Sequence, residues 1–342
     1  MAVHQHRSIE IHDRSSVGEA RRISTQMAER AKLPPAELGK VPLIVTELAT
    51  NLLAHAQGGE IVLRLLPDET APGLEIIALD RGPGIDDVSV CLADGYSRGG
   101  TRGCGLGAVR RLSTDFDINS RQPAGSVVMS RVRGGGPHPG PCEFSAISVP
   151  APGETECGDA WSLRQVGNKL AAIVVDGLGH GPLAAAAAGQ ALEVFSEHWF
   201  PTPADYLAAA DAAMRSTRGA ALAIAEIDLG ARELHYAGVG NIAARIVNLA
   251  ANRQQSLVSH GGIVGAGLRK VQQFDYRWQE GDLLVMHSDG LNERWNLGNY
   301  PGLARTDVAV IAGIVYRDAK RTRDDATVLA GRLTASLFDA HV

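Results

Sequence analysis

Cysteine is scarce in this chain of 342 residues, and its spacing suggests no role in holding a fold together. No two cysteines stand at the short spacing of a zinc-binding or redox pair, so neither a disulfide framework nor a zinc site is expected. The four are Cys91, Cys104, Cys142 and Cys157. We therefore expect reduced thiols, as in a cytoplasmic protein.

Other absences narrow the class of protein further. No apolar run reaches membrane-spanning length, and the opening residues, MAVHQHRSIEIHDRSS, lack the apolar core of a signal peptide. The formal net charge is -5, and no run of lysine and arginine stands out. The composition therefore favours neither nucleic acid nor a membrane as partner, and we expect a soluble cytoplasmic protein.

A run of glycine and proline, RVRGGGPHPGP, is the clearest break in the chain, from Arg131 to Pro141. Such a run fits neither a helix nor a central strand, so we interpret it as a linker. The predicted organisation is a domain over 1–133, a linker over 134–141 and a domain over 142–342. Each domain is long enough to bury its own core.

Hydrophobic periodicity predicts an α+β fold for both halves. In the first half, strands and helices are segregated, which favours a mixed sheet covered on one face. Its second helical segment, PPAELGKVPLIVTELATNLLAHAQ, contains Pro42, which marks a kink or a late start. The second half contains eight strand-like segments and three helices, the last over about 303–317. Two antiparallel sheets with flanking helices fit that pattern.

The segment ELATNLLAHA places three polar side chains on one helix face. Glu47, Asn51 and His55 follow one another at intervals of four residues. An acid and an amide on one face can together serve a hydroxyl group and a magnesium ion. The alternative interpretation is a helix face that is simply exposed to solvent, which would show the same spacing.

Two glycine-containing loops follow that segment. In LDRGPGI, Asp80 ends a hydrophobic strand, and Gly82 and Gly84 permit a tight backbone turn. In GYSRGGTRGCGLGAVRRL, five glycines between Gly99 and Gly107 precede a helix whose free N–H groups suit a triphosphate. Each loop alone is a weak signal, but the order of the three elements is specific.

The order ExxxN, DxGxG and GxGLG over residues 8–133 resembles the GHKL ATPases, and in particular the serine/threonine kinases of bacterial partner switching. These are the anti-sigma factor and stressosome switch kinases. The resemblance implies a GHKL (Bergerat) α/β sandwich that binds ATP and Mg²⁺. It implies that Asn51 ligates Mg²⁺, that Asp80 accepts the adenine amino group, and that Glu47 orients or deprotonates the attacking hydroxyl. The glycines that would shape the loops around the nucleotide are Gly82, Gly84, Gly103, Gly105 and Gly107.

Four aspartates in the second half stand out by their context. They are Asp159 in CGDAW, Asp176 in VVDGLGHG, Asp289 in LLVMHSDGLNE and Asp324 in RDDATVL. The strand, turn and helix around DGLGHG can cradle a phosphate or hold an aspartate for a metal ion, and a simple turn cap is the third alternative. Four acids without recurrent cysteine or histidine partners favour hard cations such as Mg²⁺ or Mn²⁺.

The pattern GD, DGxGHG, SDGL and DDAT over residues 143–335 resembles the PPM (type 2C) serine/threonine phosphatases, most closely their compact SpoIIE-like branch. The resemblance implies an α-β-β-α sandwich and two Mn²⁺ or Mg²⁺ ions that activate water for attack on phosphorus. Asp176 would bridge the two ions, with Gly177 contributing its carbonyl, and Asp289 and Asp324 would complete the ligand set. Asp159 would act directly or through water.

Two neighbouring residues keep open roles in that resemblance. Asp325 is adjacent to Asp324 and can substitute for it, although the family register favours Asp324. His180 either protonates the leaving serine alkoxide or has only a packing or solvent role.

Together the halves predict a bifunctional switch enzyme. One domain would phosphorylate serine or threonine on a partner protein of the STAS type, and the other would remove such phosphates. The alternative is an ATP-dependent docking module without kinase turnover, which would bind a sigma factor or a downstream phosphatase, fused to an active phosphatase. Glu47 favours the kinase, because sequestration needs no base.

Overall fold

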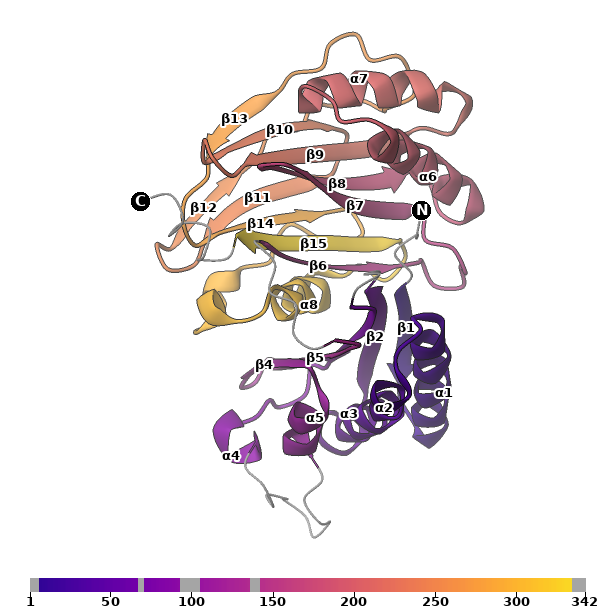
Figure 1. Cartoon of the computed structure of the whole chain (residues 1–342), viewed down its shortest axis with the longest axis vertical. Coiled ribbons are helices and arrows are strands. Elements are labelled where there is room, and N and C mark those ends of the chain that lie inside the picture. Colours follow the sequence, from indigo (N-terminus) through magenta and orange to yellow (C-terminus); the bar gives the residue numbers. More distant parts are fainter. Residues whose placement is uncertain (1–5, 67–70, 93–104, 136–141, 334–342) are drawn as a thin grey trace. The chain divides into compact units, whose positions relative to one another are not determined.

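The computed structural model describes residues 6–66, 71–92, 105–135 and 142–333. The chain divides into two compact units (Figure 1). The first comprises Met1–Gly140 together with Tyr300–Arg317, and the second comprises Pro141–Asn299 and Asp318–Val342. The first unit therefore includes a segment from late in the sequence. No helix among the described residues is long and apolar enough to cross a membrane.

The first unit contains one five-stranded sheet in the order β1-β2-β3-β5-β4. Its strands are β1 (His6–Ile11), β2 (Gly59–Leu66), β3 (Gly73–Leu79), β4 (Asp115–Arg121) and β5 (Gly125–Arg133). Every neighbouring pair is antiparallel, so the expectation of a mixed sheet is wrong. A tight turn such as the one between β4 and β5 can join only antiparallel strands, whereas β1–β2 and β3–β5 pair strands that are far apart in the sequence, so local patterns do not predict their direction.

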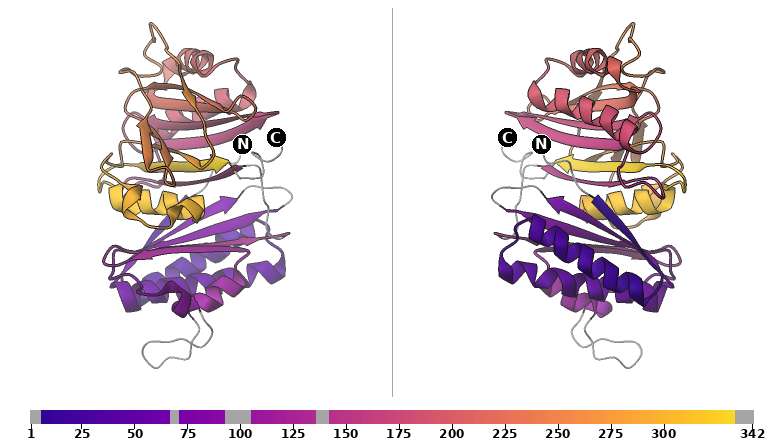
Figure 2. Two further views of the ribbon diagram at one scale, coloured as in Figure 1. Left: turned by 90° about the vertical axis from the view of Figure 1, so that its left-hand side faces the viewer. Right: turned by 90° about the vertical axis from the view of Figure 1, so that its right-hand side faces the viewer.

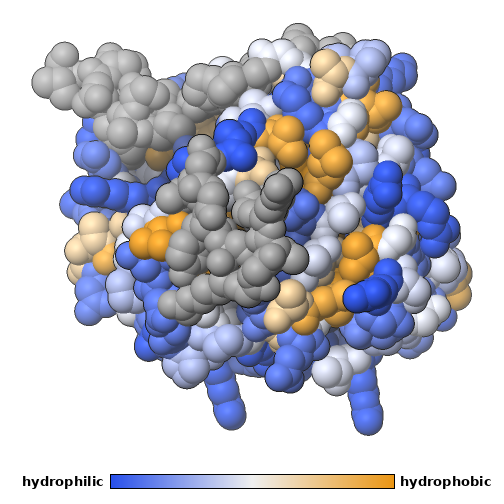
Figure 3. Space-filling view, turned by 90° about the horizontal axis from the view of Figure 1, so that it is seen from below, coloured by the Kyte–Doolittle hydropathy of each residue, from blue (hydrophilic) through white to orange (hydrophobic). Residues whose placement is uncertain are grey.

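The helices between β1 and β4 in the sequence cover one face of the sheet (Figures 1 and 2). They are α1 (Arg14–Arg30), α2 (Pro35–Leu38), α3 (Lys40–Ala56), α4 (Val88–Leu92) and α5 (Leu106–Leu112). The predicted second helical segment breaks at Gly39, so Pro42 lies in the first turn of α3, where proline is tolerated. Helix α3 buries a stripe that runs from Val41 to Leu52 against the sheet. Figure 3 shows the molecule from below relative to Figure 1, and on this surface hydrophilic side chains separate small hydrophobic patches.

The segment Tyr300–Arg317 packs on the opposite face of the same sheet. It contains a short 3-10 turn, Leu303–Arg305, and most of helix α8 (Val308–Ala319). A Cβ atom added to Gly313 of α8 would lie 2.7 Å from Val127 Cγ1 and 3.1 Å from Leu79 Cδ2. Both strand residues alternate with those that face the helical layer, so this helix approaches the other side of the sheet closely.

A buried charge network ties that segment to the strands. Glu75 is fully buried and accepts from Arg64 Nε (2.8 Å) and Arg131 Nε (2.7 Å), and these two cations hold its pKa well below the usual range. The Arg131 guanidinium also donates to both carboxylate oxygens of Asp307, at 2.6 and 2.8 Å. Tyr316 Oη donates to Glu60 Oε1 at 2.7 Å. Paired and hydrogen-bonded in this way, the buried charges are tolerated.

The second unit contains two five-stranded antiparallel sheets, β13-β10-β9-β8-β7 and β12-β11-β14-β15-β6. The strands of the first of these sheets are β7 (Asp159–Val166), β8 (Lys169–Gly177), β9 (Ala220–Asp228), β10 (Glu233–Val239) and β13 (Phe274–Arg277). Those of the second are β6 (Cys142–Val149), β11 (Ala243–Asn248), β12 (Arg253–Ser256), β14 (Asp282–His287) and β15 (Ala326–Leu333). Hydrophobic patterning did not predict the short strands β12 and β13: β12 is polar and largely exposed, and β13 alternates half-buried aromatic with exposed charged side chains.

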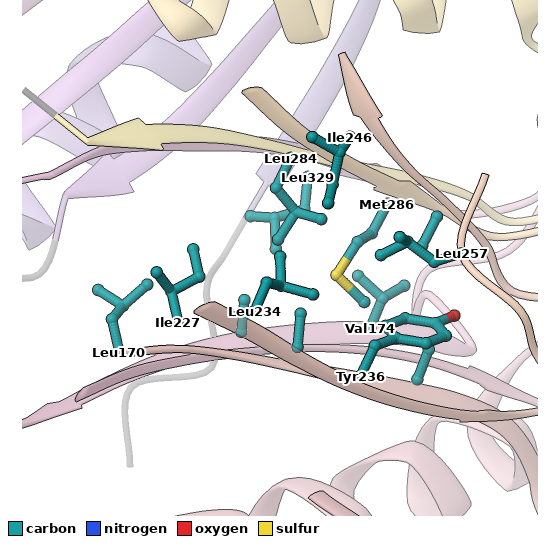
Figure 4. Packing of buried hydrophobic residues seen from close by; sticks show 14 of the residues in the cluster. Leu170, Val174, Ile227, Leu234, Tyr236, Ile246, Leu257, Leu284, Met286 and Leu329 are labelled. Atoms are coloured by element: carbon teal, nitrogen blue, oxygen red, sulfur yellow. The ribbon is translucent and has the colours of Figure 1, made fainter. Parts of the chain in front are cut away.

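The two sheets pack face to face through a shared hydrophobic core (Figure 4). Val174, Leu234 and Tyr236 project from one sheet toward Leu284 and Met286 of the other. Helices α6 (Pro182–Glu197) and α7 (Pro203–Ala213), followed by the 3-10 turn Met214–Ser216, cover the outer face of the β7–β10 sheet with a second core. The packing of these layers fixes the positions of the end of β8, the end of β14 and the start of β15 relative to one another.

Candidate nucleotide and metal sites

Helix α3 carries the acid and the amide predicted for the first site. Glu47 and Asn51 are half-buried, whereas His55, one turn further, is exposed. The helix buries the stripe beside them in the core, so these two side chains lie at the border between core and solvent. Partial burial raises the pKa of Glu47, which makes this carboxylate a stronger base than an exposed one.

The Asp80 carboxylate lies at the end of β3 and is held by backbone groups. Its Oδ1 accepts from the N–H of Gly82 (2.8 Å) and of Ser126 (3.2 Å). Burial raises the pKa of Asp80, and these hydrogen bonds oppose that rise. A Cβ on Gly82 would lie 2.7 Å from the Cβ of Ala56, so glycine lets this turn approach the end of α3.

The remaining glycines of the predicted nucleotide loops differ in what surrounds them. Gly84 has a φ of +76°, and a Cβ there would lie 2.6 Å from the Arg121 carbonyl oxygen. A Cβ on Gly107 would lie 3.0 Å from the Leu92 carbonyl oxygen, whereas the space beside Gly105 is open. Gly103 lies outside the described residues, as do Gly99 and Gly100. The structure therefore describes the predicted nucleotide-binding residues on α3, after β3 and at the start of α5, but not those of the loop before Gly105.

In the second unit, the four predicted aspartates lie at strand ends that face one another. Asp159 and Asp176 are direct cross-strand neighbours on β7 and β8. Asp289 follows β14 and Asp324 precedes β15, which are adjacent strands paired antiparallel. The antiparallel pairing places both acids at the same end of that sheet.

Hydrogen bonds connect the acids of the two sheets. Ser288 Oγ donates to Asp159 Oδ2 at 2.6 Å and accepts from the N–H of Thr327 at 3.0 Å. Asn241 Nδ2 donates to Asp289 Oδ2 at 2.7 Å. The β7 end is thereby fixed against β14 and β15, and the acids form one cluster across the sandwich.

Burial and mutual repulsion make the cluster hold protons unusually tightly. Burial, with Asp159 and Asp289 nearby, raises the pKa of Asp176 to about 9. Burial also raises the pKa of Asp159 to about 7, although the Ser288 hydrogen bond opposes the rise. The pKa of Asp289 is raised by burial and by Asp324. Like charges held this close favour either bound protons or a bound cation.

Asp324 and Asp325 have different environments. Asp325 is buried, and its two carboxylate oxygens accept from the N–H of Ala151 (2.8 Å) and of Gly158 (3.0 Å). It therefore holds the loop that leads into Asp159. Asp324 is half-buried, and its charge raises the pKa values of Asp176 and Asp289.

The DGLGHG turn lies beside this cluster. Gly177 is packed so closely against the backbone of Ala184 in α6 that no side chain fits there. His180 is exposed, and its Nδ1 lies 2.6 Å from Glu154 Oε1. The turn thus lies between the acids and the start of the alanine-rich helix.

The donor set suits hard divalent cations. Carboxylates and a backbone carbonyl are the ligands that Mg²⁺ and Mn²⁺ prefer, and the high pKa values of Asp159 and Asp176 show how strongly this cluster favours positive charge. Among the described residues, no three His, Cys, Asp or Glu side chains are grouped closely enough to hold a metal ion as they stand. The fit therefore rests on the chemistry of the donors.

Sequence patterns did not single out Ser288 and Asn241, which are polar partners of the acids. Asp325 was a predicted alternative to Asp324, and its carboxylate accepts from the backbone N–H groups of the loop before Asp159. Asn241 lies in YAGVGNI, directly after a glycine-rich strand end, which is the one local signal that could have marked it.

Two known domain families match the chain. Residues 12–131 match the histidine kinase-like ATPase domain family, and residues 167–334 match the family of stage II sporulation protein E (SpoIIE). The chain thus belongs to the partner-switching proteins, with an N-terminal RsbT-like kinase domain and a C-terminal SpoIIE-type PP2C phosphatase domain like that of RsbX. The resemblance expected from the sequence motifs is confirmed.

Individual relatives agree with both assignments. The chain is 32% identical over 111 residues to the serine/threonine-protein kinase RsbT of Bacillus subtilis (strain 168), covering 32% of this chain and 84% of that protein. It is 25% identical over 140 residues to the phosphoserine phosphatase RsbX of the same organism, covering 41% and 70%.

Solved structures resemble the chain as well. One, from work on the bacterial stressosome as a modular system adapted to control secondary messenger signaling, is 28% identical with a TM-score of 0.52, covering 56% of this chain and 99% of the other. RsbX crystallised with magnesium is 20% identical with a TM-score of 0.51, covering 58% and 98%, which establishes a shared fold.

Proposed function

We propose that this chain is a bifunctional serine/threonine kinase and phosphatase of a partner-switching pathway that acts on STAS-type partner proteins. The observation that carries the proposal is the acidic cluster of the second unit, in which carboxylates from two sheets meet beside a glycine turn. The identity of RsbT as a serine/threonine kinase and of RsbX as a phosphoserine phosphatase supports the two opposed reactions. The likeness to a stressosome structure supports STAS-type partners.

In the phosphatase reaction, Asp176, Asp289 and Asp324 would hold two Mn²⁺ or Mg²⁺ ions, with the Gly177 carbonyl as a further ligand. Asp159 would contribute directly or through water. When bound, such ions lower the pKa of water and polarise a phosphoryl oxygen. Ser288 and Asn241 would keep the Asp159 and Asp289 carboxylates oriented by their hydrogen bonds.

The phosphatase is tested by hydrolysis of p-nitrophenyl phosphate. We expect activity that requires Mn²⁺ or Mg²⁺ and falls by at least about a hundredfold in Asp176→Asn, because a carboxylate that would hold the ions is lost. Glu156→Ala, which changes an exposed acid in the preceding loop, is the matched control and keeps wild-type activity. Full activity in excess EDTA would contradict the proposal.

In the kinase reaction, Asn51 would ligate Mg²⁺, Asp80 would bind the adenine amino group, and Glu47 would orient the attacking hydroxyl. Phosphoryl transfer depends mainly on positioning and electrostatics, and these half-buried groups on rigid elements provide both. Burial, which raises the pKa of Glu47, favours its role as a base.

The kinase is tested by transfer of radiolabel from ATP to a candidate STAS protein. We expect transfer by the wild type and a loss of about a hundredfold or more in Glu47→Ala, the size typical for removal of a general base. Transfer at the wild-type rate in Glu47→Ala would remove Glu47 from the mechanism. No transfer by either protein, with ATP still bound, would favour the alternative of a docking module.

A further inference from the structure

Three segments of the second unit meet at the rim of the acidic cluster. The N–H of Leu178, two residues after Asp176, donates to the carbonyl of Gly219 at 3.1 Å. A Cβ on Gly219 would in turn lie 2.6 Å from Ile263 Cγ2, and Ala220 bridges to Val264. The DGLGHG turn, the start of β9 and the loop near Ile263 are therefore neighbours in space.

One cation of this rim lies against the glycine turn. Arg218 is exposed, and its Nη1 lies 3.1 Å from the position that a Cβ on Gly179 would occupy. Gly179 is three residues from Asp176. Among the described residues, no carboxylate lies within ion-pair distance of Arg218. Its guanidinium is therefore available to an anion that enters beside the cluster.

The same rim exposes large apolar side chains. Leu183 is 60% exposed at the start of α6, and Leu178 and Ile263 are 37% and 38% exposed. The backbone of Leu178 and the side chain of Ile263 both lie next to Gly219, as described above, and Gly219 directly follows Arg218 in the chain. An exposed arginine on a rim that also exposes leucine and isoleucine is typical of a protein-binding surface more than of a small-molecule pocket.

We propose that this rim is the substrate-docking surface of the phosphatase, at which Arg218 pairs with the phosphate dianion of a phosphoserine- or phosphothreonine-bearing protein segment. Leu178, Leu183 and Ile263 then contact apolar side chains that flank the phosphorylated residue. The inference rests on the proposed phosphatase function. Arg218 supplies positive charge beside an acidic cluster that would otherwise repel a phosphate dianion. The planar guanidinium of arginine also matches the geometry of phosphate oxygens.

Binding of inorganic phosphate tests the role of Arg218 without requiring turnover. Phosphate is titrated calorimetrically onto the full chain in the presence of Mg²⁺. We expect the affinity to fall about tenfold or more in Arg218→Gln, and less in Arg218→Lys, which keeps the charge but not the fork. Arg215→Gln, an exposed arginine in the preceding 3-10 turn, is the matched control and keeps wild-type affinity. Wild-type affinity in Arg218→Gln overturns the proposal.

Hydrolysis of phosphoserine peptides tests the apolar part of the rim. A peptide with leucine on both sides of phosphoserine is compared with one that has serine there. We expect Leu183→Ser to reduce kcat/KM for the leucine-flanked peptide at least about fivefold more than for the serine-flanked one. Equal reductions for the two peptides would overturn apolar docking. Absence of metal-dependent hydrolysis in the wild type would instead refute the proposed function, whereas the phosphate titration would still report on Arg218.

Discussion

At the scale of single residues, the Asp176 carboxyl has the most unusual environment in the second unit. Its cross-strand neighbour is another aspartate, and Asp289 and Asp324 raise its pKa further. With a pKa of about 9, this group binds a proton at neutral pH unless a cation replaces it. Without metal, such a raised pKa makes folding less favourable as the pH rises from the unfolded value, near 4, toward 9.

We therefore predict that the affinity of the full chain for Mn²⁺ increases with pH. Between about pH 6 and about pH 8.5, each carboxyl that must lose a proton strengthens binding by up to about tenfold per pH unit. Asp159 contributes up to about pH 7, and Asp176 over the whole interval. Calorimetric titration in buffers of different ionisation enthalpy measures both the affinity and the number of protons released. Binding that is independent of pH and releases no protons would contradict the prediction.

The two adjacent acids Asp324 and Asp325 show why sequence patterns alone cannot assign a role to each residue. Both are carboxylates before the same strand, so composition and spacing treat them alike. Asp325 is distinguished only by the N–H groups of Ala151 and Gly158, which are more than 160 positions away in the chain. Glu47, Asn51 and Asp80 could be picked out as candidates because each lies within a short local motif, and their predicted roles came from the resemblance of those motifs to a known family.

At the scale of elements, helix α8 differs from α6 in what surrounds its glycine. Gly313 of α8 faces Ile77, Leu79 and Val127 of the first unit's sheet, and no added atom fits without displacing them. Gly189 of α6 has nothing within 4 Å of the position of an added Cβ. The same substitution is thus predicted to have opposite effects in the two helices.

We predict that Gly313→Ala lowers the free energy of unfolding of the full chain by about 1–2 kcal/mol. Overpacking against β-branched Val127 exceeds the gain in helix propensity. Gly189→Ala, the matched control, is expected to raise it by up to about 1 kcal/mol through helix propensity alone. Urea denaturation followed by circular dichroism measures both values. A stabilising Gly313→Ala would show that α8 does not lie this close to β3 and β5.

Most elements were predictable from periodicity, and the exceptions have physical causes. Strands with buried hydrophobic faces, such as β8 and β14, were evident from runs of apolar residues. Strands β12 and β13 have only four residues each, too few for a clear hydrophobic pattern, and they form because edge positions beside β11 and β10 supply backbone hydrogen bonds. The orientation of neighbouring strands in the first sheet also depends on nonlocal pairing, which explains the wrong expectation of a mixed sheet.

At the scale of the whole molecule, the two proposed ligand sites belong to different units. The residues proposed to bind the nucleotide lie in the unit formed by Met1–Gly140 and Tyr300–Arg317, and the four aspartates proposed to bind metal lie in the other. Each ligand is therefore expected to stabilise its own unit by mass action. A substitution in one site leaves the thermal shift caused by the other ligand intact.

We predict that Mn²⁺ at about a hundred times its Kd adds about 2.7 kcal/mol to the stability of the second unit. Asp176→Asn abolishes most of that gain, whereas the shift caused by a non-hydrolysable ATP analogue with Mg²⁺ persists in this variant. Differential scanning calorimetry of the full chain, with each ligand alone, measures both effects. An equal Mn²⁺ shift in the wild type and in Asp176→Asn would place the stabilising ion elsewhere.

The sequence by itself determined the two domain families, because ELATNLLAHA, DRGPGI, DGLGHG and the later aspartate motifs are local and keep their spacing in any fold. It also determined which acids and amides are candidates for chemistry. Only the tertiary structure decided that residues 300–317 pack on the first sheet, that Asp325 holds the loop before Asp159, and that Arg218 lies beside Gly179. These features depend on contacts between segments that are not neighbours in the sequence, and a local pattern does not encode which distant segment it will contact.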